Sequence, residues 1–182
     1  MKSILLSIRP QWVEKILNGK KTIEVRKQFP KKYVGWVYIY CTKDSKRDLY
    51  FNKLFNGSAY FKNNTDDQTS YEFLSNIKPI NGKVVARFWC DKVEEITTEK
   101  WSPSKEQDLL KASCLTENQL FDYCNLESGK PFYAIHISKL EIFDEPKYLT
   151  EYYKTYIETE KGIYYQVLTK APQNYCYIEG EE

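Results

Sequence analysis

Residues 5–26 carry the sequence LLSIRPQWVEKILNGKKTIEVR, which is typical of a strand, a helix and a second strand in close succession. Apolar and other side chains alternate over residues 2–8, and this alternation predicts the first strand. Pro10 suits the first turn of a helix that extends to about Asn18 with its apolar side chains on one face. Gly19 is then placed to end this helix in a left-handed conformation.

The second strand brings together the charged side chains of the motif Gly19-Lys20-Lys21-Thr22-Ile23-Glu24-Val25-Arg26. Alternation over residues 22–26 places Glu24 and Arg26 on the same strand face, while Lys21 lies at the turn before the strand. A carboxylate beside a guanidinium supplies an acceptor and a bidentate donor, which suits a nucleobase edge with a phosphate, or a modified nucleoside. The alternative is a solvated network of surface charges that contributes little to stability.

Further strands are predicted by apolar alternation in the rest of the chain. They cover residues 36–42, 83–90, 132–143, 163–168 and 175–178. Within 132–143 the alternation changes phase between Ile137 and Leu140, and this change predicts a bulge near Lys139.

Two regions between these strands have helical character. One or two helices are predicted within residues 97–125, with Ser104 and Thr116 as N-caps. Thr116 and Gln119 have the spacing of a capping box. A further helix at the edge of the fold is predicted over residues 146–157.

Residues 43–81 are polar, lack a sustained period and hold short aromatic segments. A stretch of this size and polarity is too small to own a core. So long a loop inside a compact domain is usually functional or mobile. We therefore expect a single domain over residues 1–182 with a long polar insertion at about 43–81.

The composition is that of an ordinary globular protein, with 42% apolar residues in a chain of 182. The net charge is only +2, so overall charge does not indicate a nucleic-acid binder. Lysines nevertheless gather close to the motif, at Lys20-Lys21 and Lys31-Lys32. The 16 tyrosines fit a strand-rich fold, or base stacking on exposed rings.

The chain holds 5 cysteines without CxxC spacing and 1 histidine, so neither a structural zinc site nor a disulfide framework is expected. No cofactor is expected. The first residues contain too short an apolar stretch for a signal peptide, and no run reaches transmembrane length. We therefore expect no membrane partner and a reduced, cytoplasmic location.

Four more side chains are candidates for function. Ser7 and Arg9 share a face of the first strand, and Arg9 could hold a phosphate near the helix N-terminus or be an ordinary surface arginine. Tyr40 could stack a base or pack under a helix. His136 lies mid-strand between isoleucines, which favours a structural role.

Short strands, an early helix and a later helical segment indicate a mixed α+β domain. The expected compact arrangement is a small β-barrel with flanking helices across its openings.

Residues 5–26 resemble the start of ASCH domains, which are relatives of the PUA RNA-binding fold. The hallmark of that family is G-x-K-x-x-E-x-R, and its fixed positions are matched by Gly19, Lys21, Glu24 and Arg26. Later segments are similar to a phage and prophage branch of the family, at residues 81–88, 133–138 and 171–177. The resemblance implies a PUA-like (ASCH) barrel with a ligand site at the motif.

Three functions are compatible with this resemblance. The first, which we favour, is an RNA- or nucleotide-binding module that regulates translation or transcription, with Lys21, Glu24 and Arg26 as ligand-binding residues, assisted by Ser7, Arg9 and Tyr40. The second is a hydrolase acting on RNA, or on a modified nucleoside, with Lys21 and Glu24 as the catalytic pair. Some small ASCH-type proteins resemble amidohydrolases with a threonine nucleophile, but Glu24 stands at that position here. The third is a phage-encoded factor that binds a protein through residues 43–81.

Overall fold

The computed structural model describes residues 2–52, 57–61, 78–97, 102–160 and 162–179. The helices of these residues are α1 (Pro10–Leu17), α3 (Pro103–Ser113) and α4 (Glu117–Cys124), with 3-10 turns at Leu126–Ser128 and Leu149–Glu151. The strands are β1 (Lys2–Ile8), β2 (Ile23–Arg26), β3 (Gly35–Cys41), β4 (Leu49–Asn52), β5 (Ser58–Phe61), β6 (Lys83–Cys90), β7 (Val93–Ile96), β8 (Phe132–His136), β9 (Ser138–Lys147), β10 (Tyr153–Thr159), β11 (Gly162–Val167) and β12 (Tyr175–Glu179).

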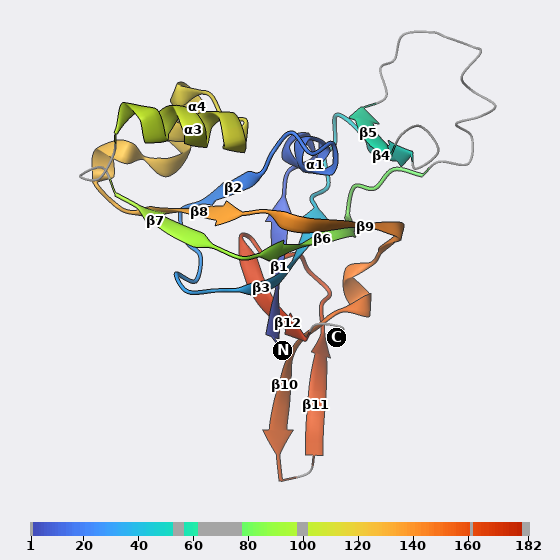
Figure 1. The fold of residues 1–182 in the computed structure, drawn as a ribbon. Coiled ribbons are helices and arrows are strands. Elements are labelled where there is room, and N and C mark those ends of the chain that lie inside the picture. Colours follow the sequence, from blue (N-terminus) through green and yellow to red (C-terminus); the bar gives the residue numbers. More distant parts are fainter. Residues whose placement is uncertain (1, 53–56, 62–77, 98–101, 161, 180–182) are drawn as a thin grey trace, which may run out of the picture.

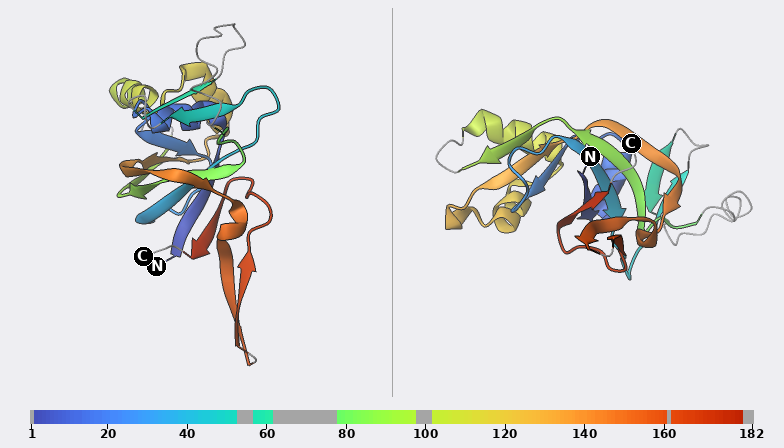
Figure 2. Two further views of the ribbon diagram at one scale, coloured as in Figure 1. Left: turned by 90° about the vertical axis from the view of Figure 1, so that its right-hand side faces the viewer. Right: turned by 90° about the horizontal axis from the view of Figure 1, so that it is seen from below.

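Two sheets form the body of the fold (Figure 1). The main sheet has the strand order β12-β1-β3-β6-β9, and the second sheet has the order β2-β8-β7. β1 and β3 are parallel, and the crossover that parallel neighbours require is supplied by α1 and β2. β4 with β5 and β10 with β11 form two separate hairpins, and the second hairpin projects away from the sheets (Figures 1 and 2). The mixed α+β class is therefore confirmed.

The prediction of a small β-barrel is wrong, because the sheets do not close. β12 and β9 are the edges of the main sheet, and within the described residues no strand pairing joins either edge to the second sheet. The predicted strand 132–143 is divided between the sheets, because β8 belongs to one and β9 to the other. The bulge near Lys139 is confirmed, since Lys139 has a φ of 44° and the β6–β9 register shifts beside it. The chain thus passes from sheet to sheet without closing the ladder.

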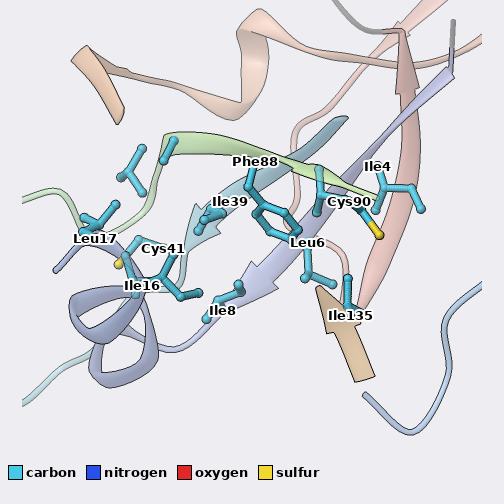
Figure 3. Close-up of a cluster of buried hydrophobic side chains, with 14 of the residues drawn as sticks. Ile4, Leu6, Ile8, Ile16, Leu17, Ile39, Cys41, Phe88, Cys90 and Ile135 are labelled. Carbon is cyan, nitrogen blue, oxygen red and sulfur yellow. The ribbon is translucent and has the colours of Figure 1, made fainter. Parts of the chain in front are cut away.

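The main sheet is covered on both faces. On one face, alternate side chains of β1 pack against α1. The helix contributes Val13, Ile16 and Leu17, which are buried in this contact. Figure 3 shows this cluster around Phe88, with Ile135 reaching it from β8. A second buried cluster lies on the other face and consists of Leu5, Tyr38, Tyr40, Val84, Tyr152, Leu168 and Ile178. The alternation read from the sequence therefore divides the β1 side chains between two cores.

The helices α3 and α4 cover the second sheet. Leu109, Leu120 and Cys124 pack there against Val25 and Phe132. The predicted capping box of α4 is confirmed, because Thr116 accepts from the Gln119 backbone while the Gln119 side chain accepts from the Thr116 N–H.

Two helix predictions fail. Ser104 is not the N-cap of α3, because Pro103 takes the first helical position and leaves Ser102 as the cap. The predicted helix over 146–157 is replaced by the end of β9, a 3-10 turn and β10. Its aromatic and β-branched residues favour strands, and β11 supplies the pairing partner.

None of the helices in the described ranges has the length and apolar character needed to cross a bilayer.

The β4–β5 hairpin, which lies within the predicted insertion, is attached to α1 by Asn18. The Asn18 Nδ2 donates to the Ala59 carbonyl at 2.9 Å, and the Asn18 Oδ1 accepts from the Ala59 N–H at 2.8 Å. Phe51 and Phe61 pack against the main core. The aromatic segment at 71–74 lies outside the described residues.

Replacing Asn18 with Ala removes both hydrogen bonds to Ala59 and leaves a part-buried N–H and carbonyl without partners. We expect a loss of about 1–3 kcal/mol in unfolding free energy. Hydrogen exchange at the Ala59 amide should accelerate more than at the Ile39 amide in the main sheet. Equal protection of Ala59 in the variant and the wild type would show that the hairpin does not depend on Asn18.

Candidate functional site

The end of α1 sets the position of the motif. Gly19 has a φ of 67°, and a Cβ placed there would meet nothing within 4 Å. Glycine is therefore required for its backbone conformation and not for space. The N–H groups of Lys20 and Lys21 both donate to the Lys15 carbonyl, at 2.9 and 3.0 Å. This turn holds Lys21 against the helix before the chain enters β2.

The three motif charges form one network. Lys21 Nζ lies 3.2 Å from Glu24 Oε2, and Arg26 Nε lies 2.9 Å from Glu24 Oε1. The residues are only 2%, 5% and 8% exposed, in the order Lys21, Glu24 and Arg26. The alternative of a solvated surface network is therefore excluded by burial. The two cations and one carboxylate leave a formal charge of +1 within the fold.

Backbone carbonyls from distant segments complete the network. Lys21 Nζ donates to the Ser113 carbonyl at 2.7 Å, and Arg26 Nη2 donates to the Ser7 carbonyl at 2.6 Å. Arg26 Nη1 donates to Asn174 Oδ1 at 3.1 Å. The network thus connects β2 with the end of α3, the end of β1 and the segment before β12.

Asn174 is fixed in turn by its other groups. Its Nδ2 donates to the Gln28 carbonyl at 2.9 Å, and its own carbonyl accepts from the Ser7 N–H at 3.0 Å. The Ser7 hydroxyl donates to the Pro172 carbonyl at 2.7 Å. Arg26 therefore meets acceptors that are themselves held in place.

Arg26 keeps one buried donor without a hydrogen bond. Its Nε faces Glu24 as an ion pair, but the N–H lacks hydrogen-bond alignment toward any acceptor in the described residues. The buried donor therefore still has a charged partner at contact distance.

Two lysines, Lys21 of the network and Lys27 just after the motif, each lie over an aromatic ring. Lys21 Nζ lies 5.3 Å from the centroid of the Trp12 ring, within the range of a cation–π contact. Tyr123 lies on α4, and the Lys27 ammonium is 5.3 Å from the centroid of its ring.

The remaining predicted residues are placed differently. Arg9 is exposed at the N-cap of α1, and its side chain makes no capping hydrogen bond. Tyr40 packs with Leu5 and Tyr38 in the second cluster, on the face of the main sheet away from α1. Ser7 meets the network through its backbone carbonyl and not its hydroxyl. His136 Nε2 lies 2.6 Å from Glu94 Oε1 in a part-exposed pair outside the network.

Sequence reasoning missed three residues that contact the motif, namely Ser113, Asn174 and Trp12, whose ring lies under Lys21. It also missed Tyr123, which contacts Lys27 just after the motif. Ser113 contributes only a carbonyl, which any residue type carries, so no signal could have found it. Asn174 lies in the segment 171–177, which resembles the family, and that likeness was an available signal.

The thiols differ in their surroundings: Cys114 Sγ lies 3.2 Å from the Lys20 carbonyl of the motif, whereas Cys41, Cys90 and Cys124 are buried. The five cysteines are free, and burial raises the pKa of Cys41, Cys90 and Cys124 to about 12. These three thiols therefore stay protonated at neutral pH. Within the described part of the chain, no three His, Cys, Asp or Glu side chains are grouped closely enough to hold a metal ion.

Solved structures with this arrangement of elements include an ASCH protein from Zymomonas mobilis. One mutant form aligns with a TM-score of 0.57 and 15% identity over 97% of this chain and 88% of the other. A second mutant form aligns with a TM-score of 0.51 and 16% identity over 82% and 77% of the two chains. The chain shares its fold with ASCH-domain proteins. The ASCH fold is thus supported by coordinates as well as by the motif, whereas no family model and no curated protein matches the sequence.

Replacing Glu24 with Ala leaves two buried cations without their carboxylate. We expect the free energy of unfolding to fall by about 3–5 kcal/mol, the usual cost of removing one partner of a buried ion pair. The measurement is denaturant unfolding.

Glu141→Ala is the matched control, because it removes a carboxylate 2.7 Å from Arg87 Nε in a more exposed pair. Its cost should be about 0–1 kcal/mol. Similar losses in the two variants would mean that the burial of the motif network has no energetic consequence.

Proposed function

We propose that this protein is an RNA- or nucleotide-binding module of the PUA-like type, and that its ligand site is built on Lys21, Glu24 and Arg26. The observation that carries the proposal is the formal charge of +1 on a buried network. Burying unbalanced charge costs free energy that a well-packed apolar cluster would not. An anionic ligand would balance this charge.

The surroundings of the network suit a phosphate-bearing ligand. Lys20 and Lys27, near the two ends of the motif, are exposed and available for phosphate oxygens. Because the whole chain carries only +2, we expect modest affinity with a shallow dependence on salt.

Hydrolysis of RNA or of a modified nucleoside is the second candidate, favoured by the 3.2 Å contact between Lys21 and Glu24. A carboxylate and an ammonium at this distance could exchange roles as base and acid. Thr22, the nearest hydroxyl in the motif, is exposed and lies outside the network. The candidate chemistry therefore rests on the Lys21–Glu24 pair.

Other sequence interpretations stay predictions. The likeness to a phage and prophage branch rests on sequence segments alone, and so does a cytoplasmic location. A protein partner for residues 43–81 is not favoured by the described part of that insertion, where Tyr50 stacks on Tyr60 and Phe51 packs inward.

The test is a gel assay with end-labelled single-stranded RNA, run with and without magnesium, on the wild type, Lys21→Ala and Lys2→Ala. Both substitutions remove one lysine charge, but Lys2 lies at the opposite end of β1 from Ser7. We expect Lys21→Ala to weaken binding about tenfold or more, since it removes a charge-assisted donor and the excess positive charge. Lys2→Ala should bind as the wild type does.

Unchanged binding by a folded Lys21→Ala protein would refute the site. Shortened RNA produced by the wild type and not by Lys21→Ala would establish the ribonuclease candidate instead. If the wild type neither shifts nor cleaves the RNA, RNA is removed as the ligand and the search moves to modified nucleosides.

A further inference from the structure

Tyr123 combines an exposed ring with a position beside the motif. It lies near the end of α4, whose Leu120 and Cys124 anchor the helix on the second sheet. The Tyr123 side chain is 41% exposed and does not belong to the described cluster beneath α4. The helix is therefore fixed by other residues, and much of this ring stays open to solvent.

The two ends of Tyr123 meet different surroundings. Burial raises the pKa of its hydroxyl, while Arg26 lowers that pKa and Glu24 raises it. Both charged groups therefore act on the phenol oxygen, which faces the network. A side-chain hydrogen bond with Arg26 is among the causes of the pKa shift, so the hydroxyl end lies at the network.

A cation is already placed at this ring. Lys27, the residue after the motif, holds its ammonium 5.3 Å from the ring centroid. Lys27 is exposed, so its ammonium can pair with a phosphate while its stem stays against the ring. Because Lys27 lies over one face of the ring, a base would stack on the other face. Single-stranded nucleic acid is held by such combinations, with bases on aromatic rings and the backbone on cations.

We propose that Tyr123 is the stacking platform for one nucleobase of a bound single-stranded RNA, with Lys27 on an adjoining phosphate and the motif network beneath. This inference rests on the proposed function and adds to it the class of ligand and the residue that holds the base. Because stacking tolerates any base, the platform gives affinity without a strong sequence preference.

Fluorescence anisotropy with a labelled oligouridine tests the platform in four proteins: wild type, Tyr123→Phe, Tyr123→Ala and Tyr148→Ala. Tyr148 is the matched control, since it is also an exposed tyrosine with a lysine, Lys83, 5.4 Å from its ring centroid. We expect Tyr123→Phe and Tyr148→Ala to keep wild-type affinity. Tyr123→Ala should lose about five- to hundredfold, the range measured for a stacked base.

A second measurement uses oligouridines with one abasic nucleotide, moved along the strand. At one position the abasic change should weaken the wild type about as much as Tyr123→Ala does, and the two changes together should cost no more than either alone. Additive losses at every position would overturn stacking on Tyr123.

The outcomes also separate this inference from the proposed function. Equal losses in Tyr123→Phe and Tyr123→Ala would assign Tyr123 to holding Arg26 through its hydroxyl, and would overturn the platform. Unchanged binding by Tyr123→Ala, with binding still lost in Lys21→Ala, would overturn the platform and keep the motif site. Absence of oligouridine binding by the wild type would overturn the platform and remove single-stranded RNA as the ligand, which leaves nucleotides as the ligand class of the motif site.

Discussion

The Glu24 carboxylate, buried between Lys21 and Arg26, is the contact on which the arrangement of this fold depends. Each cation has a second acceptor in another part of the chain: Lys21 in the Ser113 carbonyl, and Arg26 in the Ser7 carbonyl. Without the carboxylate, both cations would lose their charged partner and keep only neutral ones, which solvate charge less well than water. The Glu24 side chain thus lowers the free energy needed to bring α3, β1 and β2 together.

The sheets make this contact more important than it would be in a closed barrel. No strand pairing in the described ranges joins the second sheet to an edge of the main sheet. Arg26 on β2 reaches Ser7 at the end of β1, so a charge-assisted hydrogen bond spans part of the junction where backbone pairing is absent. Hydrogen bonds of this kind are stronger than neutral ones, and they place the excess charge at the junction.

Local features of this molecule could be read from the sequence. Four predicted features depend on a few neighbouring residues, and the structure has all of them. They are the strand–helix–strand order over residues 2–26, the left-handed Gly19, the Thr116 capping box and the irregularity at Lys139. The meeting of Glu24 with Arg26 followed from a strand period of two. The burial of the network did not, because it depends on Ser113 and Asn174, far along the chain. The helix expected over 146–157 failed because pairing with β11, which no local pattern reveals, decided its conformation.

The double use of Arg26 limits how a ligand could bind. Its Nη1 and Nη2 groups hold Asn174 and the Ser7 carbonyl, and a ligand that displaced them would also separate β2 from β1. Each Nη group carries a second N–H and Nε contacts Glu24 as an ion pair, but Arg26 is only 8% exposed. A ligand that keeps the fold intact must therefore draw most of its contacts from groups that face solvent, such as the Tyr123 ring and the Lys27 ammonium. The buried positive charge then attracts an anionic ligand through its electrostatic field, and the exposed groups make the direct contacts.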